Sequence, residues 1–139
     1  MAAFLKRWWP SMCVLAAVLW LTLAPHPVPD VEVPSFLGEH ADKIVHCIMF
    51  GGLTGAVIFD FMRWRGRDCR LRPFVMWLAV GMLIFAAADE WAQGALGAGR
   101  TSDVWDFVAD TVGILLATVT APPVVRAILR HKRESRRHG

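Results

Sequence analysis

The chain has 139 residues, of which 55% are hydrophobic, 11% are aromatic and only 19% are charged, and its mean hydropathy is +0.42. Soluble domains are about 45–50% apolar and about 25% charged, so this composition excludes an ordinary water-soluble domain, a disordered chain and a coiled coil. The apolar residues fall into four long runs that carry few charges, which indicates a membrane protein.

The first run, Trp8 to Ala24, follows Lys6 and Arg7 and is predicted to be an uncleaved membrane helix. A signal peptide is the alternative, because such peptides also combine a basic start with an apolar stretch. The stretch here is about 17 residues long, against about 7–15 in signal peptides. Its only cleavage-like site is followed by Pro25, which suits a cleavage junction poorly.

Three further spans are predicted at about Asp42 to Met62, Pro73 to about Trp91, and about Asp103 to Val125. Each has close to the ~20 residues that a helix needs to cross ~30 Å of hydrocarbon. Pro73 suits the first turn of its helix, whereas Pro122 and Pro123 are expected to end or kink the last span. The predicted fold is therefore an all-α four-helix transmembrane bundle, with residues 1–125 as the membrane domain and residues 126–139 as a basic cytoplasmic tail.

The basic residues lie almost entirely on one side of the predicted membrane. All but two of the 15 Lys and Arg are there, the exceptions being Lys43 and Arg100, whereas all but three of the 12 Asp and Glu lie on the other side. The positive-inside rule makes the basic side cytoplasmic, and an even number of spans then places both termini there. Anionic lipid headgroups explain the basic tail, so the pI of about 9.1 does not indicate a nucleic-acid partner.

Polar side chains gather at the outer ends of the last three spans. Within each span they are three or seven residues apart, so they share one helix face. An ionised side chain at mid-helix costs about 2.5–3.5 kcal/mol to insert, and intramembrane ionisable residues are therefore candidates for a functional site. The predicted site comprises Lys43, His46, Glu90, Gln93, Arg100, Asp103, Asp106 and Asp110.

At these residues the sequence resembles the VanZ-like family of small bacterial membrane proteins. The resemblance covers about residues 40 to 120 and rests on the ordered positions Asp42-Lys43-x-x-His46, Glu90-x-x-Gln93, Arg100, Asp106, 110 and Gly113. Asp110 departs from the family, which commonly has asparagine there. The resemblance implies a multi-pass protein of the bacterial cytoplasmic membrane and a link to low-level resistance to the glycopeptide teicoplanin. It implies no particular reaction.

Three functions are compatible with this pattern. In the first, the outer site binds or processes a cell-envelope lipid or lipid-linked precursor. Its ligand-binding residues are then Lys43, Gln93, Arg100, Asp103 and Asp110. Because carboxylates outnumber basic groups there, an anion alone is a poor match to the site.

The second function is an enzyme that acts on a lipid phosphate, with His46, Glu90 and Asp106 as catalytic acid–base groups. The carboxylates are also hard oxygen ligands suited to a divalent cation such as Mg²⁺, Mn²⁺ or Ca²⁺. The third function is purely structural: a polar network that fixes the bundle and supports an envelope partner protein. Helix-end aspartates and a snorkelling Lys43 favour this third interpretation.

The charge distribution makes a direct topological prediction. Reporter fusions at Arg67 and Gly139 should read cytoplasmic, and a fusion at Asp30 should read external. An external reporter at Gly139 would contradict both the four-span map and the sidedness of the polar cluster.

Overall fold

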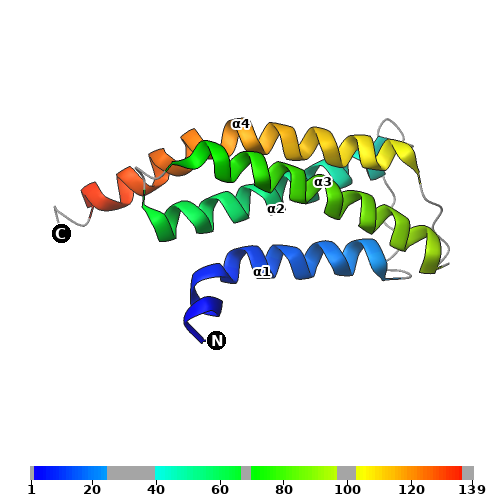
Figure 1. Cartoon of the computed structure of the whole chain (residues 1–139), viewed down its shortest axis with the longest axis horizontal. Helices are drawn as coiled ribbons and strands as arrows, with labels where there is room; N and C mark the ends of the chain where they lie inside the picture. The colour runs from blue at the N-terminus through cyan, green and yellow to red at the C-terminus, as the bar shows by residue number, and fades with distance from the viewer. Residues whose placement is uncertain (1, 25–39, 67–69, 97–102, 136–139) are drawn as a thin grey trace.

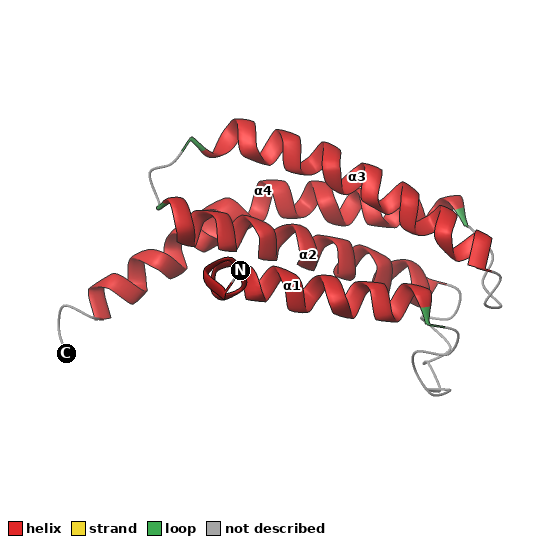
Figure 2. Ribbon diagram, turned by 60° about the horizontal axis from the view of Figure 1, so that its bottom comes forward, coloured by secondary structure: helices red, strands yellow, loops and turns green. Residues whose placement is uncertain are grey.

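A computed structural model describes residues 2–24, 40–66, 70–96 and 103–135 of the chain. These residues form four helices and no strand (Figures 1 and 2): α1 (Ala2–Leu23), α2 (Ala41–Arg65), α3 (Leu71–Leu96) and α4 (Val104–Ser135). The predicted all-α fold with four helices is confirmed.

Three of the helices are long and apolar enough to cross a membrane, namely Ala41–Arg65, Leu71–Ala95 and Val104–Lys132. Large apolar side chains point outward from them, and Trp77, Ile84 and Val119 are 76%, 66% and 75% exposed. Such an exposed apolar surface is expected to face the hydrocarbon of a membrane. In its described part α1 does not reach the same apolarity, because Lys6 and Arg7 interrupt it, so its crossing of the membrane stays a prediction.

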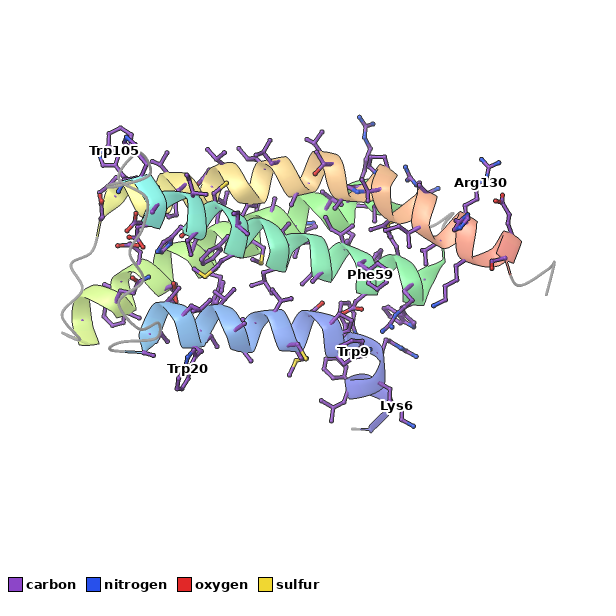
Figure 3. The ribbon with its side chains drawn as sticks, turned by 180° about the vertical axis from the view of Figure 1, so that it is seen from behind. Lys6, Trp9, Trp20, Phe59, Trp105 and Arg130 are labelled. Atoms are coloured by element: carbon purple, nitrogen blue, oxygen red, sulfur yellow. The ribbon has the colours of Figure 1, made fainter. Side chains whose placement is uncertain are left out.

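Consecutive helices run in opposite directions, so α2 and α4 are parallel to each other (Figure 1). α1 packs on α2 and α3, and the described residues contain no contact between α1 and α4. We call the end of the bundle where α2 and α4 begin the acidic end, and the opposite end the basic end. Trp105 marks the acidic end, and Lys6 and Arg130 mark the basic end (Figure 3).

The contact between α2 and α4 is made by backbone. A Cβ atom added at Gly51 would lie 3.1 Å from the Gly113 carbonyl oxygen, and one added at Gly113 would overlap the carbonyl oxygen of Cys47. One turn along α2, a Cβ atom added at Gly55 would lie 3.9 Å from the Ala121 methyl group, an ordinary contact distance. The GxxxG spacing of Gly51 and Gly55 therefore permits close helix approach, as such small-residue motifs do in membranes.

Apolar side chains fill the bundle around this contact and on its basic side. Val18, Phe50, Met82 and Ile114 bring one buried residue from each helix into the central core. A second cluster, built around Ile58, Met62, Leu71 and Val125, continues the core to the basic end. The core thus holds all four helices in register with the polar residues at the acidic end.

Pro122 and Pro123 do not end the fourth helix. α4 continues through both prolines to Ser135 and projects past the other helices at the basic end (Figure 1). The first ten residues of the predicted basic tail are therefore helical. A proline pair removes two backbone hydrogen bonds, but the N–H groups that follow it can resume the helical pattern.

Sequence reasoning missed a second buried polar group, Asp60, which stabilises a break in α1. Pro10 lies inside α1 and lacks the N–H that would bond the Lys6 carbonyl. The next N–H, from Ser11, donates instead to Asp60 Oδ2 at 3.0 Å, and the Ser11 hydroxyl donates to the same oxygen at 2.6 Å. The carbonyls of Lys6 and Arg7 thereby lose their helical N–H donors, and Arg63 donates to them instead. Two α2 side chains thus satisfy the backbone that Pro10 disrupts.

The glycine contact predicts a matched pair of variants. Gly113→Ala should destabilise the bundle by about 1–3 kcal/mol, the usual cost of overpacking, because its new methyl group meets α2 backbone that cannot move aside. Gly52→Ala should be neutral or slightly stabilising, since nothing lies within 4 Å of a Cβ there. Thermal unfolding of both purified variants in detergent, followed by circular dichroism, measures the difference. Equal stability of the two variants would refute the backbone contact.

Candidate functional site

The acidic end joins the start of two helices to the end of a third. Asp42 lies in the first turn of α2 and Asp106 in the first turn of α4. Both helix dipoles point their positive ends at this region, which favours carboxylates there. The dipoles explain why acidic side chains collect on these two helices, although they do not explain the deeper residues.

His46 and Asp110 form the deepest pair. His46 Nδ1 lies 3.1 Å from Asp110 Oδ1, and each residue is only 1% exposed. The pair sits directly on the acidic side of the Gly51–Gly113 contact, which brings α2 and α4 close enough for two short side chains to meet. A carboxylate bonded to one ring nitrogen, here Nδ1, fixes the orientation of the imidazole and leaves Nε2 available to a ligand.

Lys43 bridges the same two helices nearer the membrane surface. Its ammonium lies 3.0 Å from Asp103 Oδ2 and 3.5 Å from Asp106 Oδ1. Asp103 precedes α4 and caps it, because its Oδ1 accepts a hydrogen bond of 2.9 Å from the Trp105 N–H. This N–H bond, followed by the Lys43 contact, lowers the pKa of Asp103 below its ordinary value. Asp103 therefore carries a negative charge in the folded protein at neutral pH.

Glu90 ties the end of α3 to the start of α4. Its Oε1 accepts a hydrogen bond of 2.6 Å from the Asp103 N–H, while its buried Oε2 has no hydrogen-bond partner. Asp89, the preceding residue, accepts hydrogen bonds from Gln93 Nε2 at 3.1 Å and from Thr22 Oγ1 at 2.9 Å. Thr22 belongs to α1, so side-chain hydrogen bonds at the acidic end connect all four helices.

One group of side chains at this end has the geometry of a cation site. One ligand atom each of Asp42, His46 and Asp106 lies within 4.8 Å of the others. Two carboxylates and an imidazole suit a divalent ion such as Mn²⁺ or Zn²⁺. With Nε2 as the metal ligand, Asp110 would hold the histidine through Nδ1, as carboxylates often do around metal-bound histidines.

The structure brings most of the predicted site residues together at the acidic end. Of the four carboxylates expected to be metal ligands, Asp106 alone belongs to the described cation group. Asp103 contacts Lys43, Asp110 contacts His46, and Glu90 accepts a hydrogen bond from the Asp103 N–H just before α4. Gln93 bonds Asp89, which lies one turn away at i, i+4. Arg100 lies outside the described residues.

Sequence reasoning did not include Asp42, Asp89 and Thr22 in the site. Asp42 adjoins Lys43 in the sequence, and it lies in the first turn of α2, where ordinary helix-end carboxylates also occur. Asp89 adjoins Glu90, and only its i, i+4 spacing to Gln93 pointed inward. Nothing in the sequence signalled Thr22, because a threonine near the end of an apolar run has no pattern of its own.

The described cluster is strongly acidic. Lys43 is its single lysine or arginine among the described residues, and it stands against six carboxylates: Asp42, Asp89, Glu90, Asp103, Asp106 and Asp110. Burying several like charges in a low-dielectric region is costly unless protons, basic groups or bound cations compensate them. The geometry therefore favours a cation or a proton-transfer group over a bare anion.

The chain was compared with protein families, curated proteins and solved structures. The family model described as VanZ/LLP1 matches residues 8–126. No curated protein and no solved structure matched the chain. The match extends the sequence resemblance from the polar cluster to α1 and the basic end of α4, and with three helices able to cross a membrane it leads to one conclusion. This chain is a membrane protein that belongs to the VanZ/LLP1 family.

Proposed function

We propose that the acidic end of the bundle binds or processes the phosphate of a cell-envelope lipid or lipid-linked precursor, with a divalent cation between protein and phosphate. The proposal places the protein in the bacterial cytoplasmic membrane, with both termini in the cytoplasm and the acidic end in the outer leaflet. The family's link to glycopeptide tolerance fits a ligand from the cell envelope.

The proposal rests on the cation group formed by Asp42, His46 and Asp106. Three protein ligands leave further coordination positions on a divalent ion, which phosphate oxygens can occupy. Lys43 already contacts Asp106, so its ammonium could donate to another oxygen of the same phosphate. A cation thus resolves the conflict between an acidic site and an anionic ligand.

The position of the cluster favours a lipid over a soluble ligand. Asp42 and Asp106 lie in the first turns of membrane-spanning helices, where lipid phosphates also lie. Exposed Trp91 and Trp105 flank this end, and tryptophan is enriched at the headgroup level of membranes. A lipid bound there keeps its chains in the bilayer while its phosphate reaches the cluster.

Cation binding can be measured first. At about 100 times its dissociation constant, Mn²⁺ should stabilise the purified full chain in detergent by about 2.7 kcal/mol, read as a rise in Tm. Asp42→Asn should abolish the shift, because it removes a ligand from an exposed position and so spares the fold. Asp103→Asn is the matched control: it removes one charge from the same end and keeps a good helix cap, so the shift should survive.

The lipid is tested on the same three proteins. Binding of a polyprenyl phosphate should need Mn²⁺, disappear with a chelator and be lost in Asp42→Asn. Binding that is equally strong with and without Mn²⁺ would contradict the cation bridge. No binding of lipid phosphate by a protein that does bind Mn²⁺ would contradict the lipid part of the proposal.

The His46–Asp110 pair favours a second candidate, acid–base catalysis on the same lipid phosphate. A buried carboxylate on Nδ1 holds Nε2 ready to take a proton from an attacking water, which is the arrangement of a general base. Glu90, with one buried oxygen that no hydrogen bond occupies, is the candidate acid. Catalysis would show as phosphate released from a lipid phosphate, with a loss of about 10²–10⁴-fold in His46→Gln.

Two substitutions at Asp110 distinguish a functional role of the His46–Asp110 pair from a structural one. Asp110→Asn keeps an oxygen that can accept from His46 Nδ1, so membrane abundance should stay near normal. Asp110→Leu leaves the buried imidazole unpartnered and should cost about 1–3 kcal/mol, with lower abundance. Immunoblotting of membranes gives abundance, and lipid-phosphate binding per unit of protein gives function. Full function in Asp110→Asn would show that the extra charge of this chain, relative to the family, is not needed.

A further inference from the structure

A groove lies between α3 and α4 at the basic end of the bundle. It has a volume of about 940 Å³ and is lined by the start of α3 and the proline-containing part of α4. Three arginines, Arg70, Arg72 and Arg126, surround it, and its remaining lining is almost wholly apolar. We propose that this groove binds an anionic glycerophospholipid, with the phosphate on the arginines and the start of an acyl chain along the apolar residues.

The three groove arginines differ from two other arginines at this end, which have carboxylate partners. Arg63 pairs with Asp60 and Arg130 with Glu134. In the described residues, none of the three groove arginines has a carboxylate partner, and no Asp or Glu lines the groove. A guanidinium binds phosphate oxygens in a bidentate manner, and three around one groove attract an anion, with no carboxylate among the described lining residues to compete for them.

The rest of the lining suits an acyl chain. Val75 and Met76 from α3 face Val119 from α4, and Met76 and Val119 are 69% and 75% exposed. The lining of α4 extends from Thr118 to Arg126, about 12 Å along the helix at 1.5 Å per residue. A phosphate at Arg126 therefore has about 12 Å of mostly apolar wall below it, toward the middle of the span. A soluble phosphate could not use this wall.

Phosphatidylglycerol is a glycerophospholipid of this kind. Its phosphate carries the negative charge that the arginines require, and its acyl chains can lie along the apolar residues.

The test compares two charge-matched double variants of the full chain. Arg72→Gln with Arg126→Gln removes two guanidiniums from the groove; Arg65→Gln with Arg130→Gln removes two from the same end but outside it. Native mass spectrometry of protein from mixed micelles gives the phosphatidylglycerol retained relative to phosphatidylcholine. Each groove arginine should contribute about fivefold in affinity, as a basic residue near an anionic surface does. The control pair should retain most of the preference.

Two further arms test the lipid chain. Val119→Trp fills the groove without changing charge, at an exposed position that should not disturb the fold, and should lower phosphatidylglycerol retention. Glycerol 3-phosphate should not displace the lipid. Equal losses in both double variants, no effect of Val119→Trp, or displacement by glycerol 3-phosphate would each overturn the proposal. None of these results depends on Mn²⁺ or on the acidic end.

Discussion

The close approach of α2 and α4 is the contact on which the rest of the structure depends. Gly51 and Gly113 let the two backbones meet, and every polar bridge between these helices lies on the acidic side of that contact. The contact fixes how closely these two helices approach, and the His46–Asp110 pair lies next to it on its acidic side. The helices are parallel, so the same contact also places both of their N-terminal dipole ends at the acidic end.

The two ends of the bundle handle buried polar groups differently. At the basic end, Asp60, Ser11 and Arg63 form a compact network that satisfies the backbone around Pro10 and leaves little unpaired charge. At the acidic end, the hydrogen bonds join all four helices but leave an excess of carboxylates over basic groups. Structural needs account for the first network. The second exceeds them, which is the reason to assign a function to it.

The charge asymmetry of the chain thus gives the bundle two chemically distinct ends. Carboxylates at one end need a cation or a proton before they can approach a phosphate, whereas the groove arginines at the other end need neither. Between them lies an apolar core of about the length of a bilayer: Asp106 and Arg126 are twenty residues apart on one helix, or about 30 Å. The family match covers both ends.

Sequence by itself determined the all-α fold, the three long apolar helices and most of the residues that meet at the acidic end, because composition and helical spacing act locally. It did not determine which of these residues contact one another. Asp110 contacts His46, and Glu90 accepts a hydrogen bond from the Asp103 N–H. Asp42 rather than Asp103 belongs to the cation group. These partners depend on the distance and rotation between helices. The roles of Asp60 and Thr22, and the passage of α4 through two prolines, likewise followed only from tertiary packing. Helical periodicity says which face a side chain is on, and only the packed bundle says what that face meets.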